Sequence, residues 1–135
     1  MKDRQQKMTG FFPIFKTGKL TDSRGREHTI TKSDLDEIAT RYNRKGSDWK
    51  EAPCVTGHPE TNSPAYGWIE SVKRIGNKLY ARAGEVVPEF ADQVKKKMYK
   101  YVSPSFRPDG TLRHIGFLGA TPPAIAGLGE VTPAF

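Results

Sequence analysis

The chain has 135 residues, a length typical of a single domain with its own hydrophobic core. The apolar share is only 36%, but seven Phe, five Tyr and two Trp supply bulky core side chains, and no apolar run approaches the length of a bilayer span or a signal segment. The one cysteine excludes an internal disulfide, and the net charge of +7 is spread along the chain, so it fits an acidic protein partner as well as a nucleic acid.

The first residues predict a leader and a strand pair. Residues 1–10 are polar and basic without periodicity, which is typical of a loose leader. Residues 11–16 predict a strand in which Pro13 favours an edge position. Residues 27–30 are expected to return as its partner after a turn at 22–25.

A core-packing helix is predicted next. Thr31 or Ser33 can cap it, and Asp34 and Asp36 lie in the first turn, where the helix dipole favours negative charge. Basic residues close its C-terminal end before Gly46. Its apolar stripe consists of Leu35, Ile38, Ala39 and Tyr42.

The middle of the chain alternates short strands with tight turns. A buried strand at 53–55 leads into Gly57-His58-Pro59, and strand-like runs at 65–72 and 78–86 are joined by a hairpin turn. Pro88 suits the first position of a second helix. The apolar stripe of this helix consists of Phe90, Val94 and Met98.

The last third predicts a hairpin and a tail. Residues 99–106 form one strand, and residues 112–118 are its antiparallel neighbour after a turn at 108–110. Residues 120–135 are rich in Pro, Gly and Ala and predict an extended tail. Strands joined mainly by tight turns, together with two helices, predict an α+β fold built on a small antiparallel sheet or barrel.

The first strand of this hairpin carries the candidate nucleophile. Alternation places Ser103 and Ser105 on one face, with Val102 and Phe106 on the other. A serine hydroxyl is a poor nucleophile until a neighbouring base takes its proton. His58, held by the Gly-His-Pro turn at the end of a strand, is the candidate base. We expect Ser103 to be the nucleophile of a serine protease, with Ser105 as its competitor.

A catalytic triad needs a third group that holds the tautomer of the base. His114 is one candidate, because pairing across the hairpin turn brings it near the serine strand, and Glu60 is the carboxylate alternative. Cys54 precedes His58 but is the weaker nucleophile candidate, since a buried thiol between Pro and Val is usually inert. His28 is assigned a surface or structural role, and no pair of Cys and His residues has the spacing of a structural zinc site.

Several separated motifs occur in the order found in one known family. The motifs are Gly57-His58-Pro59, Pro64–Ile69, Tyr101–Phe106, Leu112–Ala120, Pro122-Pro123-Ala124 and Gly127-Leu128. The chain resembles the Mu-like phage protease I proteins, which are head-maturation (prohead) proteases of tailed bacteriophages. The resemblance covers residues 11–128, and the ordered set of motifs is far more specific than any one of them.

The resemblance implies a fold and a site. These proteases are similar to the herpesvirus assemblin-type serine proteases, whose fold is a small β-barrel surrounded by helices. Carried over by position, His58 matches the general base and Ser103 the nucleophile. His114 matches the third member of a His-Ser-His triad. Where relatives have an acidic third residue, this chain has Gly116 and Phe117.

The resemblance also implies substrates, partners and domain limits. Substrates would be scaffolding and major capsid proteins and the chain itself, inside the assembling prohead in the bacterial host cytoplasm, with no metal or organic cofactor. Assemblin-type proteases dimerise, which implies a homodimer, while neither a membrane nor a nucleic acid is expected as a partner. Residues 11–128 would be the protease domain and 129–135 a C-terminal tail. The scaffolding region that commonly follows in this family is absent here, as expected of a trimmed or self-processed chain.

Two other functions compete with the protease. A non-enzymatic capsid-assembly or scaffold-binding protein of the same fold would be marked by a broken Ser/His pair, and both residues are present. A basic nucleic-acid-binding module would need a contiguous Lys/Arg face with exposed stacking aromatics. The aromatics of this chain lie mostly at core-periodic positions instead, so the protease is favoured.

Overall fold

The computed structural model describes residues 10–22, 24–46, 50–123 and 125–135, so all of the predicted leader except Gly10 lies outside the described residues. In chain order the elements are β1 (Phe12–Lys16), β2 (Gly18–Thr21), β3 (Glu27–Ile30), α1 (Lys32–Asn43), β4 (Pro53–Thr56), β5 (Gly67–Ile75), β6 (Lys78–Val86), α2 (Pro88–Lys95), β7 (Tyr101–Phe106), β8 (Leu112–Leu118) and a 3-10 helix (Thr132–Ala134). The fold is mostly β and broadly α+β, as the sequence predicts. No helix in these ranges is long and apolar enough to cross a membrane.

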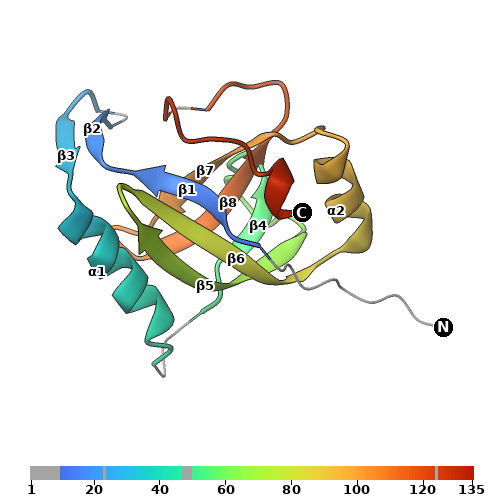
Figure 1. Cartoon of the computed structure of the whole chain (residues 1–135), viewed down its shortest axis with the longest axis horizontal. Coiled ribbons are helices and arrows are strands. Elements are labelled where there is room, and N and C mark those ends of the chain that lie inside the picture. Colours follow the sequence, from blue (N-terminus) through green and yellow to red (C-terminus); the bar gives the residue numbers. More distant parts are fainter. Residues whose placement is uncertain (1–9, 23, 47–49, 124) are drawn as a thin grey trace.

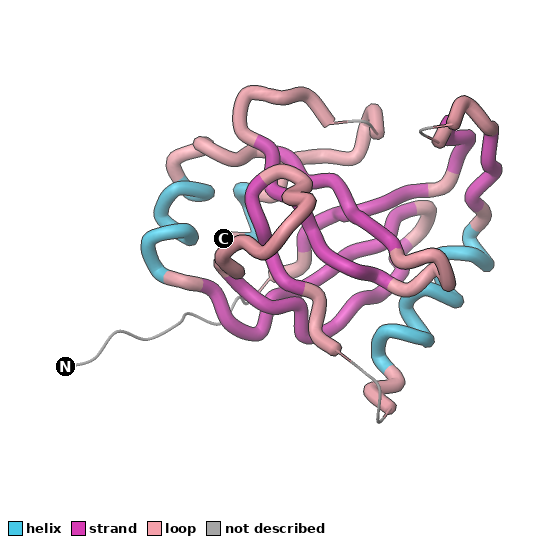
Figure 2. The backbone as a smooth tube through the Cα atoms, turned by 180° about the vertical axis from the view of Figure 1, so that it is seen from behind, coloured by secondary structure: helices cyan, strands magenta, loops and turns pink. Residues whose placement is uncertain are grey.

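A six-stranded sheet curls into a nearly closed barrel (Figure 1; Figure 2). Its strand order is β1-β6-β5-β4-β8-β7, so β1 and β7 are the two edges. Phe15 of β1 and Phe106 of β7 bridge these edges, with ring centroids 5.1 Å apart. Neighbouring strands are antiparallel except β4 and β8, which are parallel. The prediction of an antiparallel sheet or barrel is wrong at this pair, because the long connection from β4 to β8 lets both strands run in the same direction.

The β2–β3 hairpin forms its own two-stranded sheet, which corrects a predicted pairing. The sequence predicts residues 27–30 as the partner of the first strand, but β3 pairs with β2 while β1 pairs with β6. Phe12 and Ile14 of β1 are fully buried, so β1 stays in the barrel. Gly18, at a φ of 140°, allows the chain to turn away from it there. Figure 1 shows this hairpin standing at the N-terminal end of α1.

Helix α1 begins and packs as predicted. Thr31 is the N-cap, and a capping box joins its hydroxyl to the Asp34 N–H (3.1 Å) and the Asp34 carboxylate to the Thr31 N–H (2.8 Å). The Tyr42 hydroxyl donates to the Ile69 carbonyl of β5 at 2.6 Å and accepts from the Ala52 N–H at 2.8 Å. These bonds fasten the helix to the outside of the barrel. The buried residues of its stripe are Leu35, Ala39 and Tyr42.

Helix α2 is one turn shorter than its predicted stripe requires. Pro88 lies in its first turn, and Phe90 and Val94 are buried as expected. Met98, in contrast, is 54% exposed. The helix ends at Lys95, and Lys97 adopts a φ of 64°, which turns the chain before Met98 can join the stripe.

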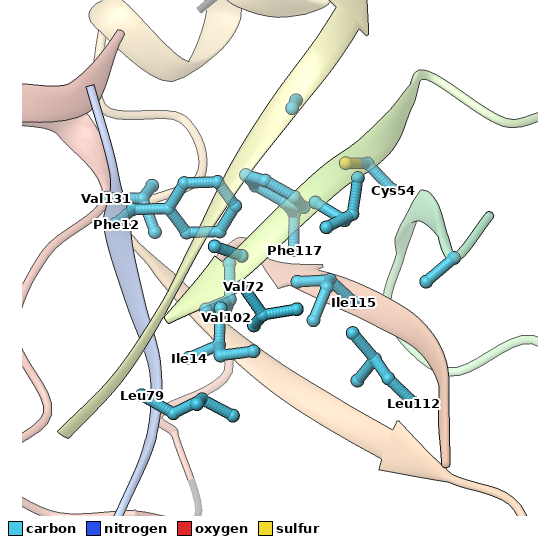
Figure 3. Packing of buried hydrophobic residues seen from close by; sticks show 14 of the residues in the cluster. Phe12, Ile14, Cys54, Val72, Leu79, Val102, Leu112, Ile115, Phe117 and Val131 are labelled. Carbon is cyan, nitrogen blue, oxygen red and sulfur yellow. The ribbon is translucent and has the colours of Figure 1, made fainter. Parts of the chain in front are cut away.

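An aromatic cluster fills the barrel beside α2. The rings of Phe12 and Phe117 are 5.7 Å apart, and Phe90 stands edge-on to Phe117 at 5.0 Å. Figure 3 shows Val131 beside Phe12 in this core. The extended tail predicted after residue 120 is corrected at its end, because Val131 is fully buried and the ring centroid of Phe135 lies 5.9 Å from that of Phe12. Burial of apolar side chains at these positions stabilises the packing of this segment against the barrel.

Candidate active site

The serine strand β7 lies at the edge of the sheet and pairs with β8. Ser103 is opposite Gly116, and Ser105 is opposite His114. Directly opposed residues of an antiparallel pair point to the same face. Val102, between the serines, is 1% exposed and faces the core. The two predicted faces of this strand are therefore confirmed, and His114 lies on the face of the serines.

His58 reaches this face from β4. The parallel pairing sets Val55 opposite Gly116, and the Gly57 N–H continues it by donating to the Phe117 carbonyl at 2.9 Å. Gly57 then takes a φ of 66°, a conformation that glycine adopts at no steric cost. This turn ends the strand and lays the next residue, His58, over β8.

Gly116 makes room for His58. A Cβ built on Gly116 would stand 2.2 Å from the Gly57 carbonyl oxygen and 3.1 Å from His58 Cε1. Any side chain at this position would push the Gly57-His58 turn away from the sheet. The residue across from Ser103 is thus the one that the histidine ring covers.

The same contact brings His58 close to Ser103. Ser103 and Gly116 are directly opposed in the antiparallel pair, where Cβ positions are about 5 Å apart. The Cβ position of Gly116 is 3.1 Å from His58 Cε1. The Ser103 Cβ therefore lies within roughly 8 Å of that ring carbon. Both side chains line one groove. No hydrogen bond joins them among the described residues, and unliganded catalytic sites often hold such pairs at a looser distance.

His58 and His114 form a hydrogen-bonded pair. His58 Nδ1 lies 2.8 Å from His114 Nε2, and the ring centroids are 5.1 Å apart. His114 is 9% exposed, whereas His58 is exposed on the groove side. One nitrogen of the contact must donate and the other accept, so the contact fixes how His58 is oriented. Nε2 is left as the free ring nitrogen of His58.

The surroundings of the pair favour uncharged imidazoles. Burial lowers the pKa of His58 below its ordinary value, and the positive charge of Arg113 lowers it further. Burial also lowers the pKa of His114, followed by the charges of His58 and Arg113. A neutral His58 is the form that can take up a proton.

The two serines are in different bonding states. The Ser105 hydroxyl accepts two hydrogen bonds from Arg113, from Nε at 3.2 Å and from Nη2 at 2.7 Å. The Ser103 hydroxyl makes no side-chain hydrogen bond to another residue in the described ranges. Ser103 is thus available to a base, while Ser105 is occupied by a cation.

An open groove of about 1130 Å³ runs over this face. Its lining includes residues of β7, His58, residues of the β2–β3 hairpin and residues of α1. The hairpin contributes Asp22 and His28, whose contact is 2.8 Å long.

Among the described residues, none of the remaining candidates from the sequence hydrogen-bonds to the histidine pair. Cys54 is 1% exposed, and burial raises the pKa of its thiol to about 12, which argues against a thiolate nucleophile. Glu60 is exposed and makes no hydrogen bond to His58 in the part of the chain that the structure describes. His28 is bound to Asp22 on the hairpin. No three His, Cys, Asp or Glu side chains among the described residues are grouped as metal ligands would be.

The fold and the site define an α+β barrel protein in which a histidine pair adjoins a serine on an edge strand. The chain belongs to the family of the Mu-like prophage I protein, whose N-terminal domain matches residues 12–132. The resemblance drawn from the separated motifs is confirmed by this match, which gives the protein a phage ancestry. No curated protein and no solved structure matches the chain.

Proposed function

We propose that this protein is a serine endopeptidase of phage prohead maturation with an assemblin-like barrel. Ser103 is the nucleophile, His58 is the general base, and His114 orients His58. The observation that carries the proposal is the 2.8 Å contact between His58 Nδ1 and His114 Nε2, made on the face where Ser103 has no competing bond. This reproduces the division of roles in a serine-protease triad, with His114 in place of the carboxylate.

The reaction proceeds through an acyl-enzyme. His58 Nε2 takes the hydroxyl proton as Ser103 Oγ attacks the peptide carbonyl carbon. The intermediate collapses with cleavage of the C–N bond, and His58 returns the proton to the leaving amine. A water molecule then attacks the ester by the same route, which releases the new carboxylic acid and restores Ser103. His114 keeps Nε2 of His58 directed to the groove in both halves.

The residue that follows the nucleophile cannot supply an oxyanion donor. In many serine hydrolases that residue supplies a backbone N–H, but here it is Pro104, which has none. A donor of this kind is worth roughly 3 kcal/mol of transition-state stabilisation. The substrate-bound state therefore needs a backbone N–H or an ordered water from another groove element.

Scaffolding and major capsid proteins, and the protein itself, are the proposed substrates. The family match places the chain among prophage proteins, and the groove is open rather than a closed small-molecule cavity. Such a protease would act within the assembling prohead in the host cytoplasm. A homodimer stays a prediction, which sedimentation of the purified protein would test.

Precursor cleavage tests the proposal. The purified protein is incubated with scaffolding and major capsid precursors of a Mu-like prophage, and new termini are mapped by mass spectrometry. Ser103→Ala abolishes cleavage and leaves the fold intact, because it removes one oxygen from a half-exposed strand position. Ser105→Ala retains measurable activity. Binding of the precursors without any cleavage would instead identify a capsid-assembly protein, and an inactive Ser105→Ala beside an active Ser103→Ala would exchange the serines.

A further inference from the structure

Arg113 is directed onto the site face by a β-bulge. The pairing of β7 with β8 passes from Ser105–His114 to Phe106–Leu112, so Arg113 is an extra residue on β8. Bulges of this kind re-aim a side chain from the face that strict alternation would give it. The Arg113 side chain is exposed in the groove rather than buried in the core.

Ser105 fixes the guanidinium but does not neutralise it. Two of the five N–H donors of Arg113 are bound to the Ser105 hydroxyl, at 3.2 and 2.7 Å. No carboxylate in the described ranges lies within 4 Å of Arg113. The charge nevertheless acts on its surroundings, since it lowers the pKa of both His58 and His114.

The other arginines of the groove are engaged by the protein. Arg41 Nη1 donates to the Asp109 carbonyl at 2.6 Å, and Nη2 lies 3.9 Å from the Asp109 carboxylate. Arg107 Nη1 donates to the Leu112 carbonyl at 3.0 Å and to the Thr111 hydroxyl at 3.3 Å. Among the groove arginines in the described ranges, Arg113 alone bonds neither to a carbonyl nor to a carboxylate, and its Nη1 is left for a ligand.

We propose that Arg113 is the specificity residue of this groove and binds the carboxylate of a substrate Asp or Glu close to the scissile bond. The inference rests on the proposed protease function. The planar guanidinium presents paired N–H groups that fit a carboxylate, and Ser105 holds it in one orientation in advance. The substrate class is thus a peptide with an acidic side chain beside the cleaved bond.

The spacing along β7 sets where that side chain must be. Ser103 and Ser105 are two residues apart on one face, a separation of about 7 Å along a strand. An extended substrate has the same rise per residue. A carboxylate that reaches the Arg113 guanidinium therefore belongs to a residue within about two positions of the bond that Ser103 attacks.

A peptide series tests this assignment. Peptides blocked at both ends carry a cleavage site mapped in the precursors, with Asp or Glu replaced by Asn or Gln at each of the two positions on either side of the bond. The wild-type protein is expected to prefer the acid at one position by about 10-fold in kcat/KM, since a charge-assisted hydrogen bond at a partly screened site is worth about that factor. Arg113→Gln loses the preference, and Arg113→Glu reverses it toward Lys.

Arg41→Gln is the matched control, because Arg41 lines the same groove but is held by Asp109. This variant keeps the acid preference. A wild-type protein that cleaves these peptides without preferring an acid at any of the four positions overturns the inference and leaves the protease function standing. If neither precursors nor peptides are cleaved, the protease function fails and the inference falls with it. The absence of a wild-type preference overturns the inference even if an Arg113 variant does not fold, and an acid preference that persists in a folded Arg113→Gln overturns it as well.

Discussion

His28 and His58 both line the groove, and each makes a contact of the same length with different electrostatic consequences. His58 lies 2.8 Å from His114 on the barrel, and His28 lies 2.8 Å from Asp22 on the β2–β3 hairpin. On the hairpin, the hydrogen bond from His28 holds the pKa of Asp22 well below its usual range, with a further contribution from the Arg26 N–H. On the barrel, burial lowers the pKa of both histidines.

The difference shows that the partner and its burial, rather than the contact distance, decide the charge state. On the exposed hairpin, the hydrogen bond from His28 stabilises the charged form of the Asp22 carboxylate, and the pair helps to close the hairpin turn. A second histidine in a partly buried position disfavours a proton on either ring. Only the barrel pair offers a neutral nitrogen beside a free serine, which is what a general base requires.

Replacing one histidine from each pair should give the largest contrast. We expect His58→Ala to lower kcat/KM for a precursor peptide by a factor on the order of 10⁴ or more, as for removal of the catalytic base in a serine protease. His28→Ala should retain most of the activity, because its ring serves the exposed hairpin. Steady-state kinetics with both purified variants checks this, and a comparable loss in the two variants would contradict the division of roles.

Substitution behind the barrel pair should be nearly as severe. Gly116→Ala sets a methyl group 2.2 Å from the Gly57 carbonyl oxygen, so we expect displacement of His58, loss of most activity and destabilisation of about 1–3 kcal/mol. Gly119→Ala, just after the end of β8, is the control, since its new Cβ would be 3.6 Å from the nearest atom. Thermal unfolding and peptide hydrolysis are measured together. Full activity in Gly116→Ala would show that the position of His58 does not depend on this glycine.

Removing the orienting histidine should cost less than removing the base. His114→Ala leaves His58 as a competent but poorly oriented base, so a reduction of about 10- to 100-fold in kcat is expected, below the full value of general-base catalysis. Glu60→Ala, measured beside it, should keep the full rate. A full-rate His114 variant beside a crippled Glu60 variant would make this a Ser-His-Glu enzyme.

The smallest effect is a shift in the pH profile. A base acts in its neutral form, so the rate should rise with pH as His58 and His114 lose their protons. Because the pKa of each is lowered, the midpoint should lie below the ordinary value of 6.5. Arg113→Gln removes a positive charge that lowers both pKa values and should move the midpoint upward, whereas Arg41→Gln should not. A midpoint that is unchanged in Arg113→Gln would show that this charge does not act on the pair.

Local patterns were enough to predict much of the fold. The capping residues of α1, the proline at the start of α2 and the alternation around Ser103 each act within a few residues, so their outcome can be read from the chain. Met98 was misplaced because the αL conformation of Lys97 has no marker such as glycine. The partners of β1 and β3 were also mistaken, since strand pairing depends on which side chains the whole barrel buries.

The site was less accessible to sequence reasoning than the fold. The Gly-His-Pro turn and the hairpin register placed His58 and His114 near the serines, and the structure brings the two rings into contact. The parallel pairing of β4 with β8, which carries His58 to its position, leaves no local signal. No local sequence pattern predicts the bulge that directs Arg113 to Ser105 either, because the bulge arises from the register of two strands.

Covalent trapping tests the central claim most directly. A peptidyl or small organophosphonate reagent reacts only with a serine whose hydroxyl a neighbouring base activates, and mass spectrometry of the digested protein locates the adduct. We expect a single adduct on Ser103, its loss in His58→Ala, and its retention in His28→Ala and Ser105→Ala. An adduct on Ser105, or labelling of Ser103 that is independent of His58, would contradict it.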